Sequence, residues 1–382
     1  MRGNRLLIKI SFFLYYTKKN SNGDTFVANF LSRKKGSLVI QNDIKLEGDS
    51  FGADVSTSGE LVFNTGMMGY LETLTDPSYS GQILVITYPL VGNYGVPKPD
   101  ESKLDWPFES KKIQVKGLIV SEYSMQNSHH DAVNSLSEWL IENNIPALSG
   151  VDTRLLTKMI RSGGNPIAMV SCGQSVDFYD PNTENQVEKV SCRSPQTYGE
   201  GEKTVLLVDM GCKNNIIRSL VNRGLKVKRV PWDYDFLGEQ FDGVLISNGP
   251  GDPEYAKQTI ERIQVMMDKD VPMMGICMGN QILALASGAK TYKLKYGHRG
   301  QNQPCVEIGT NRAYLTSQNH SYAIDEKTLS DDWMVWFRNA NDQSNEGIKH
   351  KSKPFFGVQF HPESYPGPTD TAFLFDKFKE LL

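Results

Sequence analysis

The stretch "PMMGICMGNQILALASGAK", residues 272–290, places one cysteine between two glycines where an apolar run gives way to a helical pattern. The run "PMMGIC" predicts a buried strand and "QILALA" predicts a helix, so Cys277 is expected at the corner between them. Gly275 and Gly279 flank it at i−2 and i+2, the spacing of a nucleophile elbow, whose tight turn leaves no room for side chains beside the nucleophile. The helix N-terminus favours a thiolate and offers N–H donors to an oxyanion, which suits acyl transfer. The alternative is a small buried core cysteine, so a partner base has to decide.

The best candidate for that base is His361, because the apolar run "PFFGVQFHPES" stops at it. Residues i and i+2 of an extended segment face the same side, so Glu363 is expected to reach the ring and fix its tautomer. Together with Cys277 these residues form a triad in the order Cys, His, Glu. His320 in "TSQNHSYA" is the competing base, and it has no carboxylate beside it in the sequence. Three further histidines are expected to be solvated: His129, His130 and His350.

The sequence around the elbow predicts a sheet with helices on both faces. The runs "TVLLVDM", "LKVKRV" and "FDGVLIS" are almost continuously apolar, which is typical of parallel strands buried on both faces. Residues 204–382 are therefore predicted to form a mostly parallel-sheet domain that binds ligands beyond the carboxyl ends of its strands. The loop "SNGPGDP", residues 247–253, offers backbone N–H groups for an oxyanion or a carboxylate. It lacks the glycine and lysine patterns of a nucleotide phosphate site.

The first half of the chain has a different rhythm. From "SLVIQNDIKLEGDSFGADVSTSGELVFNT" onward, short β-rich runs alternate with turn residues, and "DAVNSLSEWLIENN" and "GVDTRLLTKMIRSGG" predict helices. Residues 38–190 are predicted to form a mixed, β-rich domain. Residues 191–203 are polar and contain Pro and Gly, which predicts a linker. The fold class is therefore α/β, with the β-rich domain followed by the mostly parallel-sheet domain.

The bulk properties exclude several classes of protein. A net charge of −3 gives no overall attraction to nucleic acid or to an anionic membrane. Five cysteines without a CxxC pair argue against a disulfide framework or a structural zinc site, and for a reducing compartment. The apolar core of residues 1–37 is too short and too basic to span a bilayer, and these residues are set apart as an unstructured extension or the result of a wrong start. A signal or transit peptide is the alternative, because no acidic residue precedes Asp24. The expected location is cytoplasmic, or mitochondrial if residues 1–37 are a transit peptide.

The motifs together resemble a known family. "SNGPGDP", "GICMGNQILALASGAK", "TSQNHSYAID" and "PFFGVQFHPES" resemble the class I (triad) glutamine amidotransferases, and specifically the small subunit of glutamine-dependent carbamoyl phosphate synthetase. The first half, with "GELVFNTGMMGYLETLTDPSYSGQI", resembles the domain unique to that subunit. The likeness covers nearly everything after residue 38. It is closer to the version fused into the multifunctional pyrimidine-pathway protein of eukaryotes than to bacterial subunits.

The resemblance implies a role for individual residues. Cys277 matches the nucleophile, His361 the base and Glu363 the orienting acid. Three positions depart from the usual pattern: Met278 stands where Leu is usual, Tyr322 replaces Phe, and Ser321 replaces a glycine. Because glycine reaches positive φ more easily than serine does, we expect Ser321 to strain its loop by about 1 kcal/mol. The positions that match glutamine-binding residues are Ser78, Gly249, Gly251, Met278, Gln281, Asn319, Ser321 and Tyr322.

The resemblance also implies an activity. The chain is expected to hydrolyse glutamine to glutamate and ammonia, and to pass the ammonia to a synthetase subunit or domain that makes carbamoyl phosphate for pyrimidine or arginine biosynthesis. That partner would use ATP, Mg and bicarbonate, whereas no cofactor, metal, nucleic acid or membrane is expected for this chain. Whether the chain is a separate subunit or a portion of a fused protein is left open. The rivals are another triad amidotransferase or γ-glutamyl hydrolase, which would lack a counterpart of "LTDPSYSGQI", and a non-catalytic interaction subunit, which needs no intact triad.

Overall fold

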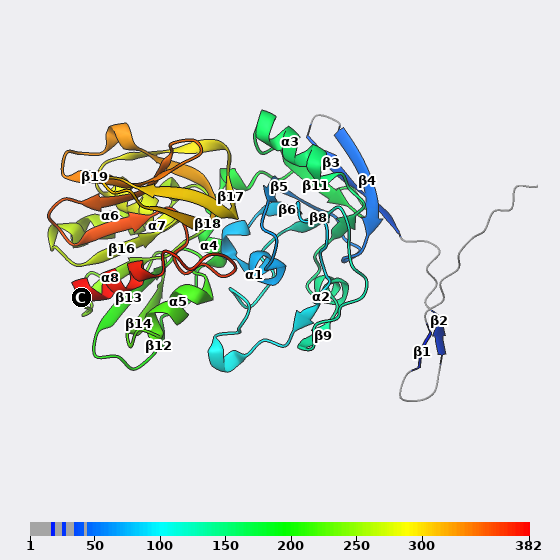
Figure 1. Ribbon diagram of the computed structural model, residues 1–382, viewed down its shortest axis with the longest axis horizontal. Helices are drawn as coiled ribbons and strands as arrows, with labels where there is room; N and C mark the ends of the chain where they lie inside the picture. The colour runs from blue at the N-terminus through cyan, green and yellow to red at the C-terminus, as the bar shows by residue number, and fades with distance from the viewer. Residues whose placement is uncertain (1–16, 20–24, 28–33, 42–43) are drawn as a thin grey trace, which may run out of the picture.

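The computed structural model describes residues 17–19, 25–27, 34–41 and 44–382, which form two lobes lying side by side (Figure 1). Two short strands, β1 (Thr17–Lys19) and β2 (Thr25–Val27), pair antiparallel. The rest of the predicted extension lies outside the described residues, except for its last four positions. Strand β3 (Lys35–Ile40) already belongs to the first lobe, so this lobe begins before residue 38.

The first lobe is built on a closed β-barrel. The two predicted helices are present: α2 (Leu136–Glu142) begins with a capping box between Ser135 and Glu138, and α3 (Thr153–Gly163) runs from an Asp152 cap to Gly164. A further helix, α1 (Tyr70–Thr75), lies on the side toward the second lobe (Figure 1). Around the barrel the strands are β10 (Ala147–Ser149), β4 (Ile44–Ser50), β3, β11 (Ile167–Ser171), β5 (Thr57–Asn64), β6 (Gln82–Ile86) and β8 (Gly117–Val120), and β7 (Val96–Pro97) pairs with β9 (Ala132–Asn134) outside it.

The second lobe contains a ten-stranded sheet that is parallel in its central part and antiparallel beyond it. The strands from β14 to β21 are parallel neighbours, and β20, β19, β17 and β18 continue the sheet antiparallel. The predicted linker is not free of structure, because three of its residues form the edge strand β12 beside β14. In spatial order the strands are β12 (Gln196–Tyr198), β14 (Lys226–Pro231), β13 (Thr204–Asp209), β15 (Gly243–Ile246), β16 (Met273–Ile276), β21 (Phe355–Val358), β20 (Asn345–His350), β19 (Trp333–Asn339), β17 (Lys290–Glu307) and β18 (Ala313–Asp325).

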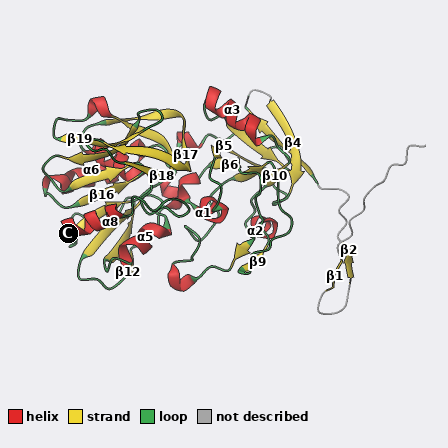
Figure 2. Ribbon diagram, in the orientation of Figure 1, coloured by secondary structure: helices red, strands yellow, loops and turns green. Residues whose placement is uncertain are grey.

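Alternation along the parallel strands places apolar side chains on both faces of this sheet. Leu206 and Val208 of β13 enter the cluster that also holds residues of α6 (Lys257–Asp268) and α7 (Met278–Ala286). Val205 and Leu207 enter the opposite cluster, with residues of α5 (Asn214–Val221) and α8 (Phe373–Leu381). Helices thus pack on both faces of the sheet, which confirms the predicted fold class, and Figure 2 shows the helices and strands of this lobe. Within the described residues, no helix combines the length and the apolar character needed to cross a membrane.

The two lobes meet along a seam that contains both apolar contacts and polar ones, such as the ion pair of Lys293 with Glu60. Strand β17 and the neighbouring β18 face the first lobe (Figure 1), and Tyr296 of β17 packs on the barrel's apolar cluster with its ring 6.3 Å from that of Phe63. The helix α4 (Val187–Val190) follows the connection between the lobes. The carboxyl ends of the parallel strands therefore open toward residues of the first lobe, where a site shared by both lobes can form.

Candidate active site

Cys277 occupies a strained corner between β16 and α7. Its backbone has φ 55° and ψ −104°, a conformation that costs a non-glycine residue on the order of 1–3 kcal/mol. The flanking glycines make this corner possible: a Cβ on Gly275 would lie 2.4 Å from the backbone of Gly279, and a Cβ on Gly279 would lie 2.0 Å from the Ile246 carbonyl oxygen. The elbow predicted from the glycine spacing is therefore present. The first N–H groups of α7 have no acceptor within the helix, so they can serve a negative oxygen beside the sulfur.

His361 and Glu363 lie behind this corner, after the end of β21. The imidazole Nδ1 is 2.6 Å from Glu363 Oε1, and both side chains are buried. Burial lowers the pKa of His361, but the Glu363 carboxylate and the adjacent Cys277 sulfur outweigh it and raise the pKa to about 10. Nε2, the other ring nitrogen, is buried and bonds to no oxygen or nitrogen of the described residues, and the Cys277 sulfur is its neighbour. The geometry predicted from the i, i+2 spacing is thus observed, with one ring nitrogen left open.

Lys213, at the start of α5, is a fourth member of this group that the sequence analysis missed. Its Nζ lies 3.1 Å from Glu363 Oε1 and donates to the Ser364 carbonyl at 2.6 Å. Although burial favours a protonated Glu363, Lys213 and His361 lower the pKa of this carboxyl to about 2. Glu363 therefore stays ionised and holds the imidazole in one orientation. The sequence feature that could have identified Lys213 as a site residue is its position just beyond the carboxyl end of β13, where sites in such sheets form.

The remaining contacts of the thiol come from amide groups. The Cys277 sulfur lies 3.7 Å from the Asn319 carbonyl oxygen, and the same sulfur accepts a hydrogen bond from Gln359 Nε2 at 3.6 Å. Gln281 donates to Gln359 Oε1 at 3.0 Å and to the Tyr322 carbonyl at 2.9 Å. These amides connect the elbow with strand β18, so the nucleophile and the adjoining cleft are held as one unit.

The predicted substrate residues line a polar cleft beside Cys277, with one exception. Met278 has its side chain in the apolar core and only 1% exposed, so its backbone alone is available to a ligand. The cleft also contains three polar residues from the first lobe, which the sequence analysis did not select: Glu60, Gln82 and Asn182. The predicted residues that line it are Ser78, Gly249, Gly251, Gln281, Asn319, Ser321 and Tyr322.

Ser78 is brought into the cleft by hydrogen bonds across the seam. Its hydroxyl accepts a bond of 2.9 Å from the Asn248 amide of the second lobe. Asp76 caps the Ser78 N–H at 2.9 Å and accepts another bond of 2.9 Å from the Asn319 side chain. The barrel domain thus contributes directly to the cleft.

The two halves of the chain match known families. Residues 206–381 match the family "Glutamine amidotransferase class-I", and residues 38–170 match "Carbamoyl-phosphate synthase small chain, CPSase domain". The chain belongs to the class I glutamine amidotransferases of the carbamoyl-phosphate synthase small-chain type.

Two relatives place this amidotransferase among large proteins. It is 52% identical over 353 residues to "Multifunctional protein CAD" of Squalus acanthias, in an alignment covering 90% of this chain and 16% of that protein. It is 48% identical over 352 residues to "Carbamoyl-phosphate synthase (ammonia), mitochondrial" of Homo sapiens, covering 90% of this chain and 23% of that protein. The chain therefore spans less than a quarter of either relative.

The expected backbone strain at Ser321 of this amidotransferase is not observed. "SQNHSYAID" lies inside strand β18 and is not a loop, and Ser321 is absent from the residues with positive φ. A strand backbone accepts any side chain, so serine needs no glycine-like conformation here. The Ser321 hydroxyl instead accepts a bond of 2.5 Å from Arg299, another cleft residue that the sequence analysis missed.

His320 is unsuited to act as the base. It is buried, its Nδ1 is 2.8 Å from the Tyr322 carbonyl oxygen, and its Nε2 is 3.3 Å from Gln318 Oε1. Burial and the neighbouring His298 keep the pKa of His320 well below its ordinary value. Both ring nitrogens already face protein oxygens, so neither is open toward Cys277.

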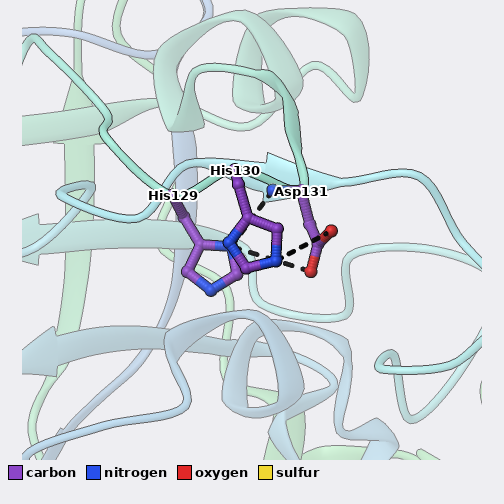
Figure 3. Close-up of side chains that lie close together, drawn as sticks. All are labelled: His129, His130 and Asp131. Atoms are coloured by element: carbon purple, nitrogen blue, oxygen red, sulfur yellow. Dashed lines mark hydrogen bonds and ion pairs between the residues drawn. The ribbon is translucent and has the colours of Figure 1, made fainter.

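The other histidines divide between surface and core. His129 and His130 are exposed as predicted, stacked with ring centroids 4.4 Å apart and 3.8 and 3.4 Å from Asp131 (Figure 3). His350 is half-buried instead of solvated, because it packs against Trp333 at 5.3 Å and Phe355 at 5.6 Å. The exposed His129, His130 and Asp131 could hold a metal ion by their spacing, but they lie on a loop of the first lobe outside the cleft.

Proposed function

We propose that the chain hydrolyses glutamine to glutamate and ammonia through a thioester on Cys277. The observation that carries the proposal is the open Nε2 of His361, which is buried at the elbow while Nδ1 is held by Glu363. A ring fixed on one side and free on the other is what a proton carrier next to a nucleophile requires. The polar cleft that begins at Cys277 presents hydrogen-bonding groups to the rest of an amino acid substrate.

The chemical steps follow from this arrangement. The Cys277 sulfur attacks the side-chain amide carbon of glutamine, and the resulting oxyanion accepts hydrogen bonds from backbone N–H groups at the start of α7. The protonated His361 imidazole gives its proton to the departing nitrogen, which leaves as ammonia. A water molecule then attacks the thioester while His361 takes one of its protons, and glutamate and the free thiol are formed.

We further propose that the ammonia serves a synthetase polypeptide, fused or separate, that makes carbamoyl phosphate for pyrimidine or arginine biosynthesis. The match of residues 38–170 to the small-chain CPSase domain supports this, as do the large relatives to which the chain is similar over part of their length. ATP, Mg and bicarbonate would be used by that partner. Cytoplasmic or mitochondrial location remains a prediction.

The test is glutamine turnover by the chain, alone and with the synthetase plus ATP and bicarbonate. The proposal expects slow hydrolysis by the lone chain, no carbamoyl phosphate, and faster hydrolysis with the partner, because waste of glutamine is avoided when closure of the site awaits the partner. A full rate from the lone chain, unaffected by any synthetase, would make it a simple glutamine hydrolase.

A second candidate is a non-catalytic subunit of an ammonia-using synthase. One relative at 48% identity is named for ammonia, so similarity alone does not separate the two functions. The intact group of Cys277, His361 and Glu363 favours the glutaminase. Labelling of Cys277 by a glutamine-analogue electrophile would exclude the second candidate.

A further inference from the structure

Arg299 is a buried cation in the wall of the cleft. It lies in β17, is only 4% exposed, and lines the same cleft as Cys277. Its Nη1 donates to the Tyr296 carbonyl at 2.8 Å and its Nη2 donates to the Ser321 hydroxyl at 2.5 Å. Its Nε is buried and donates to no acceptor in this structure. The guanidinium therefore retains free N–H groups in a place that water reaches poorly.

The other buried cations among the described residues each form an ion pair with a buried carboxylate, and Arg299 does not. Lys213 lies 3.1 Å from Glu363, and Arg218 lies 3.9 Å from Glu109, so each has a buried carboxylate beside it. Arg299 forms no ion pair with any described carboxylate. Since a buried charge without a counter-charge is costly, this position indicates an anion that is absent from the protein itself.

The carboxylate of Glu60 does not fill this role. It lines the cleft, but its Oε1 accepts from Lys293 at 2.7 Å and its Oε2 accepts from Gln82 at 2.8 Å. Burial lowers the pKa of Arg299, and the charge of Glu60 offsets this only in part. Both oxygens of Glu60 are thus engaged elsewhere, and the Arg299 N–H groups remain available to a ligand.

We infer that Arg299, oriented by Ser321, binds the α-carboxylate of the glutamine whose side-chain amide meets Cys277. The inference rests on the proposed function. Glutamine carries its amide and its α-carboxylate at opposite ends, and the cleft presents the nucleophile and a guanidinium with free N–H groups. A guanidinium binds a carboxylate through two parallel N–H···O bonds, and no existing bond to Nε would have to be broken for this contact. Ser321, which replaces the usual glycine, accepts a hydrogen bond from Nη2 and thereby fixes the orientation of the guanidinium.

The test compares two ligands in a Cys277→Ser background, where glutamine binds without being turned over. The ligands are L-glutamine and 4-aminobutanamide, which is glutamine without the α-carboxylate, and binding is measured by calorimetry with the second ligand also used as a competitor. Arg299→Met should weaken glutamine binding on the order of 10- to 100-fold, the range for a hydrogen-bonded charge pair, and leave 4-aminobutanamide within about twofold. With Cys277 intact, KM for glutamine should rise by the same factor while kcat changes little, because the contact exists before and during the reaction.

A matched control perturbs the same segment without touching the guanidinium. Thr65 donates to the Arg299 carbonyl from its N–H at 3.4 Å and its hydroxyl at 3.3 Å, so Thr65→Val disturbs the seam at this residue. This variant should keep the parent affinity for both ligands. If Arg299→Met does not fold, Arg299→Lys keeps the charge without the planar fork and should still weaken glutamine several-fold.

Two results would overturn the assignment of Arg299. Equal weakening of both ligands would make it a structural cation at the seam, and unchanged glutamine affinity would remove it from the binding site. The proposed function fails by a different readout, namely the absence of both glutamine hydrolysis and Cys277 labelling in the parent chain. Glutamine hydrolysis by the parent chain, together with unchanged glutamine affinity in the Arg299→Met variant, would therefore refute only the carboxylate contact.

Discussion

The second lobe contains two buried histidine–carboxylate groups, and they differ in how many ring nitrogens remain open. In the triad group, His361 has Nδ1 on Glu363 and Nε2 without an oxygen or nitrogen partner among the described residues. In the second group, His298 has Nδ1 3.2 Å from Glu346 and Nε2 2.8 Å from Asp342, so both nitrogens are occupied. The histidine and one carboxylate are buried in each group, but the second group adds the partly exposed Asp342, and the triad group adds the buried Lys213.

Each group also has a cysteine nearby, and the surroundings of the two thiols differ. Cys277 is placed by a strained backbone next to the cationic His361. Cys305 accepts from Gln318 Nε2 at 3.2 Å, and burial together with the negative charge of Glu346 raises its pKa strongly. Because Cys277 lies beside the cationic His361 and Cys305 lies near the anionic Glu346, we expect Cys277 to be the reactive thiol of the two.

The largest expected effect separates the two cysteines. Cys277→Ser should reduce glutamine hydrolysis by about a thousandfold or more, because the hydroxyl is a far weaker nucleophile, while the chain stays folded. The matched control Cys305→Ser should keep turnover within about threefold of the parent. Steady-state glutaminase kinetics and circular dichroism measure both variants. Retention of turnover within tenfold in Cys277→Ser would sink the assignment of the nucleophile.

The next effect separates the two histidine groups. His361→Ala should lower kcat by about 100- to 10,000-fold, the usual range for loss of a general acid–base group. His298→Asn removes a ring that has no free nitrogen, so it should cost stability and leave kcat within about fivefold. If the His298 variant lost turnover and the His361 variant kept it, the hydrogen-bond count would be the wrong criterion.

A smaller effect is expected for the orienting carboxylate. Glu363→Gln should lower kcat less than His361→Ala does, since it disturbs the ring's orientation without removing the proton carrier. The change also leaves buried Lys213 without its counter-charge, so the variant should unfold more readily. The reverse order of kcat values would indicate that a different residue is the base.

The pH dependence of that stability has a definite sign. The pKa of Glu363 is lowered to about 2 from 4.5, so its stabilising contribution is fully present above pH 4.5 and is lost as the pH falls toward 2. Denaturant unfolding should therefore show the largest difference between parent and Glu363→Gln above pH 4.5. The control Glu239→Gln breaks a partly exposed pair with Lys228 and should change the unfolding free energy by less than about 1 kcal/mol.

The smallest effect concerns the second group. Although burial lowers the pKa of His298, Asp342 and Glu346 raise it to about 9. A folded pKa above the ordinary 6.5 stabilises the fold fully below pH 6.5, and this contribution is lost as the pH rises through 9. Stability measured between pH 6 and 9.5 should decline by about 1–2 kcal/mol more in the parent than in His298→Asn. Equal declines would show that His298 is not protonated in the folded chain.

Local sequence was sufficient for the triad because its geometry is local. The elbow at Cys277 requires Gly275 and Gly279, because any side chain there would clash with the neighbouring backbone. Side chains at i and i+2 of an extended segment lie on the same side, so His361 and Glu363 meet. The helices α2 and α3 were predicted for the same reason, since their caps lie within a few residues of their ends.

The errors and omissions concern contacts between distant segments. The polar residues 196–198 resembled a linker, but they pair with β14 because the sheet edge beside them offers unpaired backbone groups. Ser321 was expected to strain a loop, whereas antiparallel pairing with β17 makes its segment a strand. Neither pairing has a signal in the segment itself.

By itself the sequence determined the order of the two domains, the strained cysteine corner, and the histidine and carboxylate that meet behind it, because each depends on short-range sterics and periodicity. Only the tertiary structure decided which histidine keeps a free nitrogen, and that buried Lys213 holds Glu363 ionised. It also decided that Ser78 of the barrel faces the cleft, and that Arg299 lines the cleft with an unpartnered Nε and no ion pair to a described carboxylate. These properties arise from groups 100 or more residues apart, or from neighbouring strands brought into register. Their energies depend on burial and on the full set of partners, which exist only once the chain has folded.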